Sequence, residues 1–140
     1  MTCLYKSGQA LLEIVTDTTV IGHVKTIFEK ERYILSMDMY CFRVAITQVR
    51  FNVLPLKNNL RRYSDRIQDK QCPFCKTKIE NERHFLLECS MYTDLRHKFL
   101  NITNNHNFCL IQMLTAQNND HMYRLSRYVF HAMNRRKLAM

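Results

Sequence analysis

The chain has 140 residues, of which 46% are hydrophobic and 11% aromatic, and its formal net charge is +9. A chain of this length supports one modest core, so we expect a single helical domain over residues 1–140. Its apolar content excludes a disordered tail. Only two Gly and two Pro are present. Because tight hairpins and strained turns need such residues, the composition predicts a mostly α fold rather than a sandwich or barrel.

The basic side chains are concentrated in two zones. Residues 41–70 hold seven basic and two acidic side chains, and residues 101–140 hold five basic and one acidic. Basic patches raise the local concentration of polyanions, so nucleic acid is the expected partner and an anionic membrane surface the second choice. An excess of positive charge can also serve solubility alone.

The N-terminal segment does not resemble a signal peptide, since Glu13 and Asp17 interrupt its apolar stretch and it lacks a small-residue cleavage pattern. No apolar run approaches membrane-spanning length, so no membrane insertion is expected. Without a route to an oxidising compartment, the six cysteines are expected to be reduced or metal-bound rather than paired as disulfides. The expected setting is the nucleus or cytoplasm.

The hydrophobic pattern predicts helices joined by polar links. They are expected, in chain order, over residues 9–15, 21–30, 32–54, 84–89 with a continuation after residue 90, 108–116 and 121–137. Pro55 should end the third helix. The basic segment Lys57–Lys70 is expected to be an irregular connector.

Two of these helices have clear apolar stripes. The stripe of the third helix consists of Leu35, Met39, Phe42, Ile46, Val49 and Val53. Arg43, Thr47 and Arg50 share another face of that helix. The last helix should place Leu125, Tyr128, Val129 and Ala132 inward and its basic residues outward.

The residues capable of specific chemistry are concentrated between positions 72 and 89. Cys72, Cys75, His84 and Cys89 follow the spacing Cys, two residues, Cys, eight residues, His, four residues, Cys. Zn²⁺ prefers four nitrogen or sulfur ligands in a tetrahedron, and two cysteines separated by two residues form a knuckle. A redox CxxC site, a disulfide pair and coincidence are the alternatives, and each lacks a supporting feature. The spacing predicts a zinc knuckle of the CCHC type within residues 72–89.

The interval between His84 and Cys89 constrains the local helix. Residues five positions apart do not share a face of a helix with 3.6 residues per turn, so we expect the helix to distort or break near Cys89. Four protein ligands leave no position for water, which makes the site structural. The sequence shows no Ser-His-Asp signature and no phosphate-cradling Gly loop, so we expect neither an enzyme nor a small-molecule substrate.

The run from Phe28 to Leu100 resembles the zinc-binding segment downstream of the reverse transcriptase domain in non-LTR (LINE-type) retrotransposon polyproteins. The matching features are Arg62 and Tyr63, the Cys72–Cys75 knuckle, Glu82, the stretch His84–Cys89, Tyr92, and Leu95 with Arg96. The chain has no YxDD-like aspartate pair and no endonuclease segment, so it is no polymerase. The resemblance implies an accessory module that associates with RNA or DNA.

Two functions follow as hypotheses. In the first, the chain binds nucleic acid: Tyr63 or Phe74 stacks on an exposed base and basic side chains contact phosphates. The basic side chains expected to do so are Arg43, Arg50, Lys57, Arg61, Arg62, Arg66 and Lys70. In the second, the chain is a zinc-stabilised helical module that binds a protein partner through apolar helix faces. A retroelement relic without selected function is the third possibility.

Overall fold

The computed structural model describes residues 32–102, 109–116 and 118–140. The helices predicted at 9–15 and 21–30 lie outside the described residues. Within these ranges the α-helices are α3 (Arg32–Ser36), α4 (Tyr40–Arg50), α5 (Lys57–Leu60), α6 (Ile67–Lys70), α7 (Thr93–Leu100), α8 (Leu110–Thr115) and α9 (Asn119–Ala139). The prediction of a mostly helical fold is confirmed. None of the described helices is long and apolar enough to cross a membrane.

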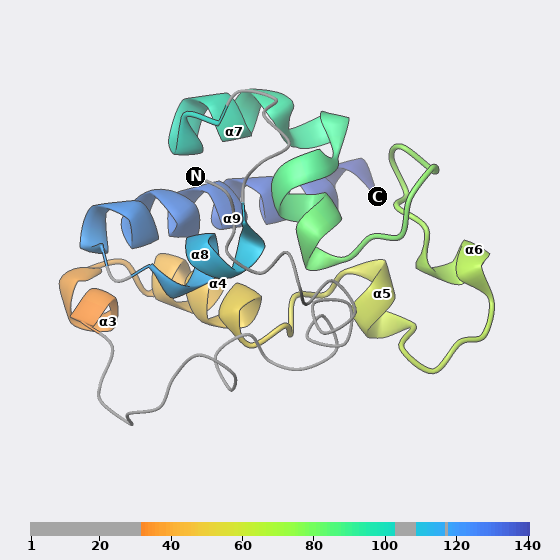
Figure 1. The fold of residues 1–140 in the computed structure, drawn as a ribbon, viewed down its shortest axis with the longest axis horizontal. Coiled ribbons are helices and arrows are strands. Elements are labelled where there is room, and N and C mark those ends of the chain that lie inside the picture. The colour runs from red at the N-terminus through yellow and green to blue at the C-terminus, as the bar shows by residue number, and fades with distance from the viewer. Residues whose placement is uncertain (1–31, 103–108, 117) are drawn as a thin grey trace.

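Helix α9 organises the core. It packs against α3, α4 and α7 and runs through the centre of the view in Figure 1. Its N-terminus is capped by Asn118, whose side-chain oxygen accepts hydrogen bonds from the backbone N–H groups of Asp120 and His121. The predicted inward face is confirmed, because its members Leu125, Tyr128, Val129 and Ala132 are all fully buried.

The single helix predicted over residues 32–54 is instead two helices. α3 ends at Ser36 and α4 begins at Tyr40. Phe42, Ile46 and Val49 from the middle of the predicted stripe are buried. The outer members of that stripe, Leu35, Met39 and Val53, are exposed.

Helix α4 also ends before Pro55, at Arg50. Asn52 adopts the left-handed conformation, with φ of 56°. Its N–H donates to the Val49 carbonyl, and the N–H of Val53 donates to the Gln48 carbonyl at 2.9 Å. This is the Schellman pattern, and asparagine tolerates the left-handed position better than most residues. The stop signal was therefore Asn52, not the proline.

Residues 57–70, here called the basic arm, include α5 and α6 and lie at one end of the molecule (Figure 1). The arm was predicted to be irregular, and its middle part, residues 61–66, is irregular. Its two ends form single helical turns, Lys57–Leu60 and Ile67–Lys70. A hairpin carrying the predicted ligands, residues 71–89, follows the arm directly and leads into α7.

Candidate metal centre

The first two ligands lie in a tight turn. The N–H of Lys76 donates to the Cys72 carbonyl at 3.0 Å, and the N–H of Cys72 donates to the Lys78 carbonyl at 2.8 Å. Lys76 adopts a positive φ of 54°. Beside this turn, Gln71 and Ile79 form an antiparallel bridge. The knuckle is therefore closed by its own backbone, with Cys72 and Cys75 on one side of the turn.

The other two ligands lie on a π-helical turn. Residues five apart are separated by roughly 140° around an α-helix, so a regular helix would turn His84 and Cys89 away from each other. The segment His84–Glu88 is instead π-helical, and the Cys89 N–H donates to the His84 carbonyl at 2.8 Å. This wider turn confirms the predicted distortion of the helix. Single π turns recur at functional sites.

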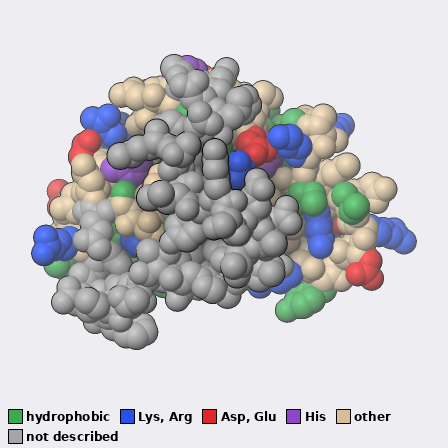
Figure 2. Space-filling view, in the orientation of Figure 1, with side chains coloured by type: hydrophobic (Ala, Val, Ile, Leu, Met, Phe, Trp, Pro, Cys, Tyr) green, Lys and Arg blue, Asp and Glu red, His purple; other side chains and the backbone are tan. Residues whose placement is uncertain are grey.

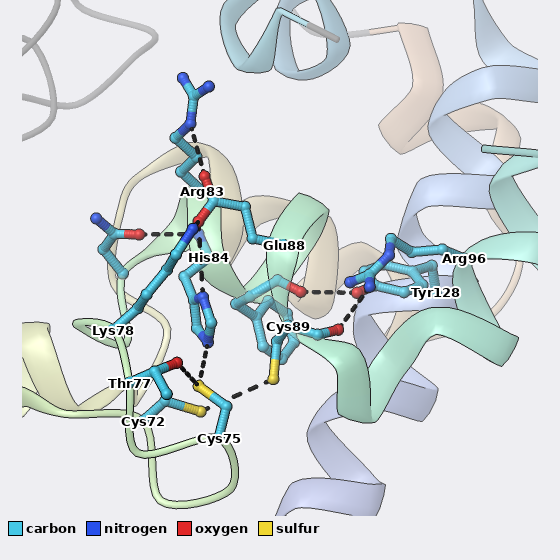
Figure 3. Close-up of polar contacts among 12 residues, drawn as sticks. Cys72, Cys75, Thr77, Lys78, Arg83, His84, Glu88, Cys89, Arg96 and Tyr128 are labelled. Atoms are coloured by element: carbon cyan, nitrogen blue, oxygen red, sulfur yellow. Dashed lines mark hydrogen bonds and ion pairs between the residues drawn. The ribbon is translucent and has the colours of Figure 1, made fainter. Parts of the chain in front are cut away.

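The four predicted ligands converge. One ligand atom from each of Cys72, Cys75, His84 and Cys89 lies within 4.8 Å of all the others. The Cys72 and Cys89 sulfurs are 3.8 Å apart, and the Cys75 sulfur is 3.3 Å from His84 Nε2 (Figure 3). Ligand atoms around one tetrahedral zinc, at about 2.0–2.3 Å from the metal, are roughly 3.5–3.8 Å apart. The cluster could hold a metal ion with little rearrangement.

The second ring nitrogen of His84 points to a carboxylate. His84 Nδ1 is buried without a hydrogen bond and is 3.7 Å from Glu88 Oε2. Glu88 is itself held by Lys78 at 2.9 Å and Arg83 at 3.1 Å. Metal-bound histidines commonly direct their other N–H to a carboxylate, which fixes the tautomer. The sequence reasoning missed this role of Glu88, although its four-residue spacing from His84 was a signal.

The thiols differ in acidity in the metal-free chain. Burial raises the pKa of Cys72 and raises that of Cys89 to about 12. Burial also opposes ionisation of Cys75, but hydrogen bonds from the Thr77 hydroxyl and from the N–H groups of Thr77 and Lys78 lower its pKa to about 7. Burial lowers the pKa of His84, which disfavours the protonated imidazole. A divalent cation supplies the charge that buried thiolates need.

Two side chains from other helices support the backbone of the π turn. In an α-helix the Phe85 carbonyl would accept from the Cys89 N–H; here it accepts from the Tyr128 hydroxyl at 2.8 Å. The Cys89 carbonyl accepts from the guanidinium of Arg96, which also donates to Thr93 Oγ1 at 3.1 Å. Tyr128 and Arg96 enter Figure 3 from the right, beside Cys89. Both roles depend on tertiary contacts and could not be found from the spacing.

Aromatic packing joins the hairpin to α9. The Phe74 and Phe85 rings each meet the Tyr92 ring edge-on, with centroids 6.1 and 5.0 Å apart. Phe85 also contacts the Tyr128 ring at 6.1 Å. Phe74 was one of two residues expected to stack on a base. Its ring is half-buried in this cluster, which favours the packing role.

The hairpin fastens both ends of the basic arm. At the first end, the Lys57 N–H donates to Glu80 Oε2 at 2.7 Å and the Asn59 side chain donates to Glu82 Oε1 at 2.6 Å. At the second end, the Glu80 N–H donates to the Lys70 carbonyl at 2.9 Å. Glu80 and Glu82 are both buried. The position of the arm therefore depends on the hairpin that carries the ligands.

The predicted nucleic-acid contacts divide into two groups. Arg61, Arg62, Tyr63 and Arg66 are exposed on the arm, and Lys57 and Lys70 at its ends are partly exposed. Within the described part of the chain, no carboxylate forms an ion pair with the three arginines.

The two arginines of α4 belong to the second group. Arg50 does not lie on the exposed face predicted for it, because only 5% of it is exposed and its guanidinium lies 4.9 Å from the Tyr33 ring centroid. That expectation is wrong: burial removes Arg50 from any phosphate. Arg43 is partly buried, with its guanidinium over Tyr40 at 6.0 Å.

The basic zone at the C-terminus is largely neutralised. Arg135 forms a bidentate pair with Asp94. Arg136 forms a bidentate pair with Glu80, at 2.7 and 2.9 Å. Two of the cations expected to point outward from the last helix thus form ion pairs that hold the fold together.

The described cysteines give a mixed result for the expected absence of disulfides. Cys41, Cys72, Cys75 and Cys89 are free thiols, as expected. Cys109 is disulfide-bonded, so the expectation that no cysteine forms a disulfide is wrong there. Sequence spacing does not reveal which distant cysteines meet in the folded chain.

The chain matches no protein-family model, no curated protein sequence and no solved structure. The resemblance to the retrotransposon zinc segment therefore stays a prediction. The structure itself establishes a mostly helical domain with a Cys-Cys-His-Cys cluster that could bind a metal ion.

Proposed function

We propose that the chain is a zinc-stabilised, non-catalytic module that binds nucleic acid, derived from a non-LTR retrotransposon. The donor set supports zinc, because three thiolates and one imidazole are ligands that this metal prefers. Cations such as Mg²⁺ prefer oxygen ligands. All four positions of a tetrahedron would be filled by protein, so the metal would hold the hairpin and carry out no reaction.

The observation that carries the proposal is the exposure of Tyr63. This side chain is 95% exposed at the tip of the basic arm. Arg61, Arg62 and Arg66 surround it in sequence and are exposed as well. On the side of the molecule that carries the arm, hydrophobic and basic side chains lie near one another at the surface, with acidic ones among them (Figure 2). An exposed ring among unpaired cations suits a base that stacks while its phosphates are neutralised.

The metal supports this function indirectly. Because Glu80 and Glu82 of the hairpin hold the first turn of the arm and the hairpin backbone holds its end, loss of zinc would release the arm from its position. The proposed module therefore binds nucleic acid in a metal-dependent way, although no contact passes through the metal.

A protein-interaction module is the second candidate, and one surface favours it. Leu35, Met39 and Tyr40 are large apolar side chains at the junction of α3 and α4, and all three are exposed. An apolar interface with a protein partner would be much less sensitive to salt than phosphate contacts are. Salt dependence therefore separates the two candidates.

The test is fluorescence anisotropy of a labelled RNA hairpin and a single-stranded DNA, with zinc-loaded protein at low and moderate salt. We expect salt-sensitive binding that is lost after chelation. Tyr63→Ala should weaken binding by about 5- to 150-fold, since stacking on one base contributes roughly 1–3 kcal/mol. Tyr40→Ala is the matched control, because Tyr40 is 74% exposed but lies outside the arm. No binding at low salt by protein holding one zinc, or equal losses in both variants, would contradict the proposal.

A further inference from the structure

A second group of cations lies outside the arm, where α7 packs on α9. Arg127 is centred over two rings, with its Cζ 5.0 Å from the Phe99 centroid and 5.7 Å from that of Tyr123. Lys98 Nζ is 5.3 Å from the same Phe99 centroid. The His131 ring stacks on Phe99 at 5.1 Å, with the two planes 4° apart. These five residues are called the α7–α9 cluster below.

No carboxylate of the described residues balances the charge of the cluster. Asp94 is the only acidic residue of α7 and Asp120 the only one of α9. Asp94 is bound by Arg135, and Asp120 is bound by Arg124 at 2.9 Å. Within the described residues, therefore, no acidic group pairs with Lys98 or Arg127.

The titration of His131 agrees with this positive surrounding. Burial lowers its pKa first, and the neighbouring charges of Arg127 and Lys98 lower it further. Lys98 and Arg127 lie 5.3 and 5.0 Å from the same ring centroid, so their positive charges add in this region. An anion bound beside the ring would be attracted by both charges.

We propose that the α7–α9 cluster is a second phosphate-binding surface, which engages the backbone of the same single-stranded nucleic acid as the arm. The choice of nucleic acid as the ligand rests on the proposed function. The residues of the cluster are separate from those of the arm. Lys98 and His131 are exposed, and Tyr123 is 40% exposed beside Arg127. A partly exposed ring next to cations suits a nucleotide, with the phosphate on the cations and the base on the ring.

The two surfaces lie on different parts of the molecule. In Figure 1 the arm is at the right, whereas α7 and the first half of α9 are at the upper and middle left. A strand long enough to reach both would gain affinity from simultaneous contact, and a short strand would occupy one surface at a time. A long oligonucleotide should therefore bind more tightly per site than a short one.

The experiment measures the salt dependence of binding to a long single-stranded oligonucleotide. Lys98→Gln with Arg127→Gln removes two cations. Because each phosphate contact on a single strand contributes roughly 0.7 to the slope of log affinity against log salt, the magnitude of that slope should fall by about 1.4. The control pair Arg32→Gln with Lys137→Gln removes the same charge from exposed positions elsewhere. A slope equal to that of the control pair would overturn the inference.

Charge-conserving variants guard against a purely structural effect. Lys98→Arg with Arg127→Lys should keep the wild-type slope, while the glutamine pair reduces it by about 1.4. If the charge-conserving pair reduced the slope as well, the residues would act through packing and the inference would fail. The inference would also be overturned if the glutamine pair bound anionic phospholipid vesicles more weakly but kept the wild-type salt slope on the oligonucleotide.

Tyr63→Ala separates this inference from the proposed function. If Tyr63→Ala weakens binding and the glutamine pair behaves as its control, the arm binds and the cluster does not. If the glutamine pair changes the slope and Tyr63→Ala leaves the affinity unchanged, the cluster is supported and the stacking role of the arm is excluded. If neither variant changes binding, both proposals fail.

Discussion

Glu80 and Arg136, which are 56 residues apart, form a bidentate ion pair with both side chains buried. Arg136 Nε lies 2.7 Å from Glu80 Oε1 and Nη2 lies 2.9 Å from Oε2. Glu80 Oε2 also accepts the N–H of Lys57, the first residue of the arm. One carboxylate thus joins the ligand hairpin, the arm and the C-terminal part of α9.

Arg136→Met should destabilise the fold strongly. It leaves Glu80, which is 1% exposed, as a buried charge without its partner, and such losses are worth about 3–5 kcal/mol. The measurement is the free energy of unfolding in urea. Lys137→Met, at an exposed position next along α9, is the control and should change stability by less than about 0.5 kcal/mol. Equal losses of stability in Arg136→Met and Lys137→Met would show that the Glu80–Arg136 ion pair has no special role. Combining Glu80→Gln with Arg136→Met removes the unpaired charge and should recover part of the stability that Arg136→Met loses.

Cys89→Ala should abolish metal binding. Cys89 is buried, and its sulfur lies 3.8 Å from that of Cys72. Structural zinc is worth on the order of 10 kcal/mol to small domains, so the helical circular dichroism signal should fall as well. Cys41→Ala is the matched control, since Cys41 is a free, partly buried thiol outside the cluster. Native mass spectrometry should find one zinc per chain in the control and none in Cys89→Ala; one zinc in both would exclude Cys89 as a ligand.

Tyr128→Phe should lower both stability and metal affinity. The variant leaves the buried Phe85 carbonyl without the hydroxyl that now donates to it at 2.8 Å, at a cost of about 1–3 kcal/mol. Because that carbonyl belongs to the π turn carrying His84 and Cys89, part of the cost should appear as weaker zinc binding in competition with a chelator. Tyr123→Phe removes a hydroxyl from a partly exposed ring and should leave zinc affinity unchanged. Unchanged affinity in Tyr128→Phe would mean that the π turn does not need this support.

Zinc affinity should rise with pH, because each thiol must lose its proton to bind. In the metal-free fold the pKa of Cys75 is lowered to about 7, while that of Cys89 is raised to about 12 and that of Cys72 is also raised. Below pH 7 three thiols release protons on binding, and above it about two do, so the slope of log affinity against pH should fall from about 3 to about 2 near neutrality. A slope that stays near 3 up to pH 8 would show that Cys75 has an ordinary thiol pKa.

The sequence was sufficient to predict which four side chains converge and the distortion of the helix that carries two of them. The spacing of Cys72, Cys75, His84 and Cys89 is local information, and the five-residue interval between the last two requires a wider turn whatever surrounds it. The inward face of α9 was equally predictable, because the periodicity of Leu125, Tyr128 and Val129 reports burial directly. The ends of helices were less predictable, because α4 ends at Arg50, where Asn52 adopts the left-handed conformation, and not at Pro55.

The availability of each positive charge was decided only by the tertiary structure. In the sequence, Arg50 and Arg136 look the same as Arg62 and Arg127. In the fold, Arg50 lies against Tyr33 and Arg136 is bound by Glu80, whereas Arg62 and Arg127 remain without a carboxylate among the described residues. Ion pairs between residues far apart in the chain depend on which helices pack together, and a charge count carries no information on that packing.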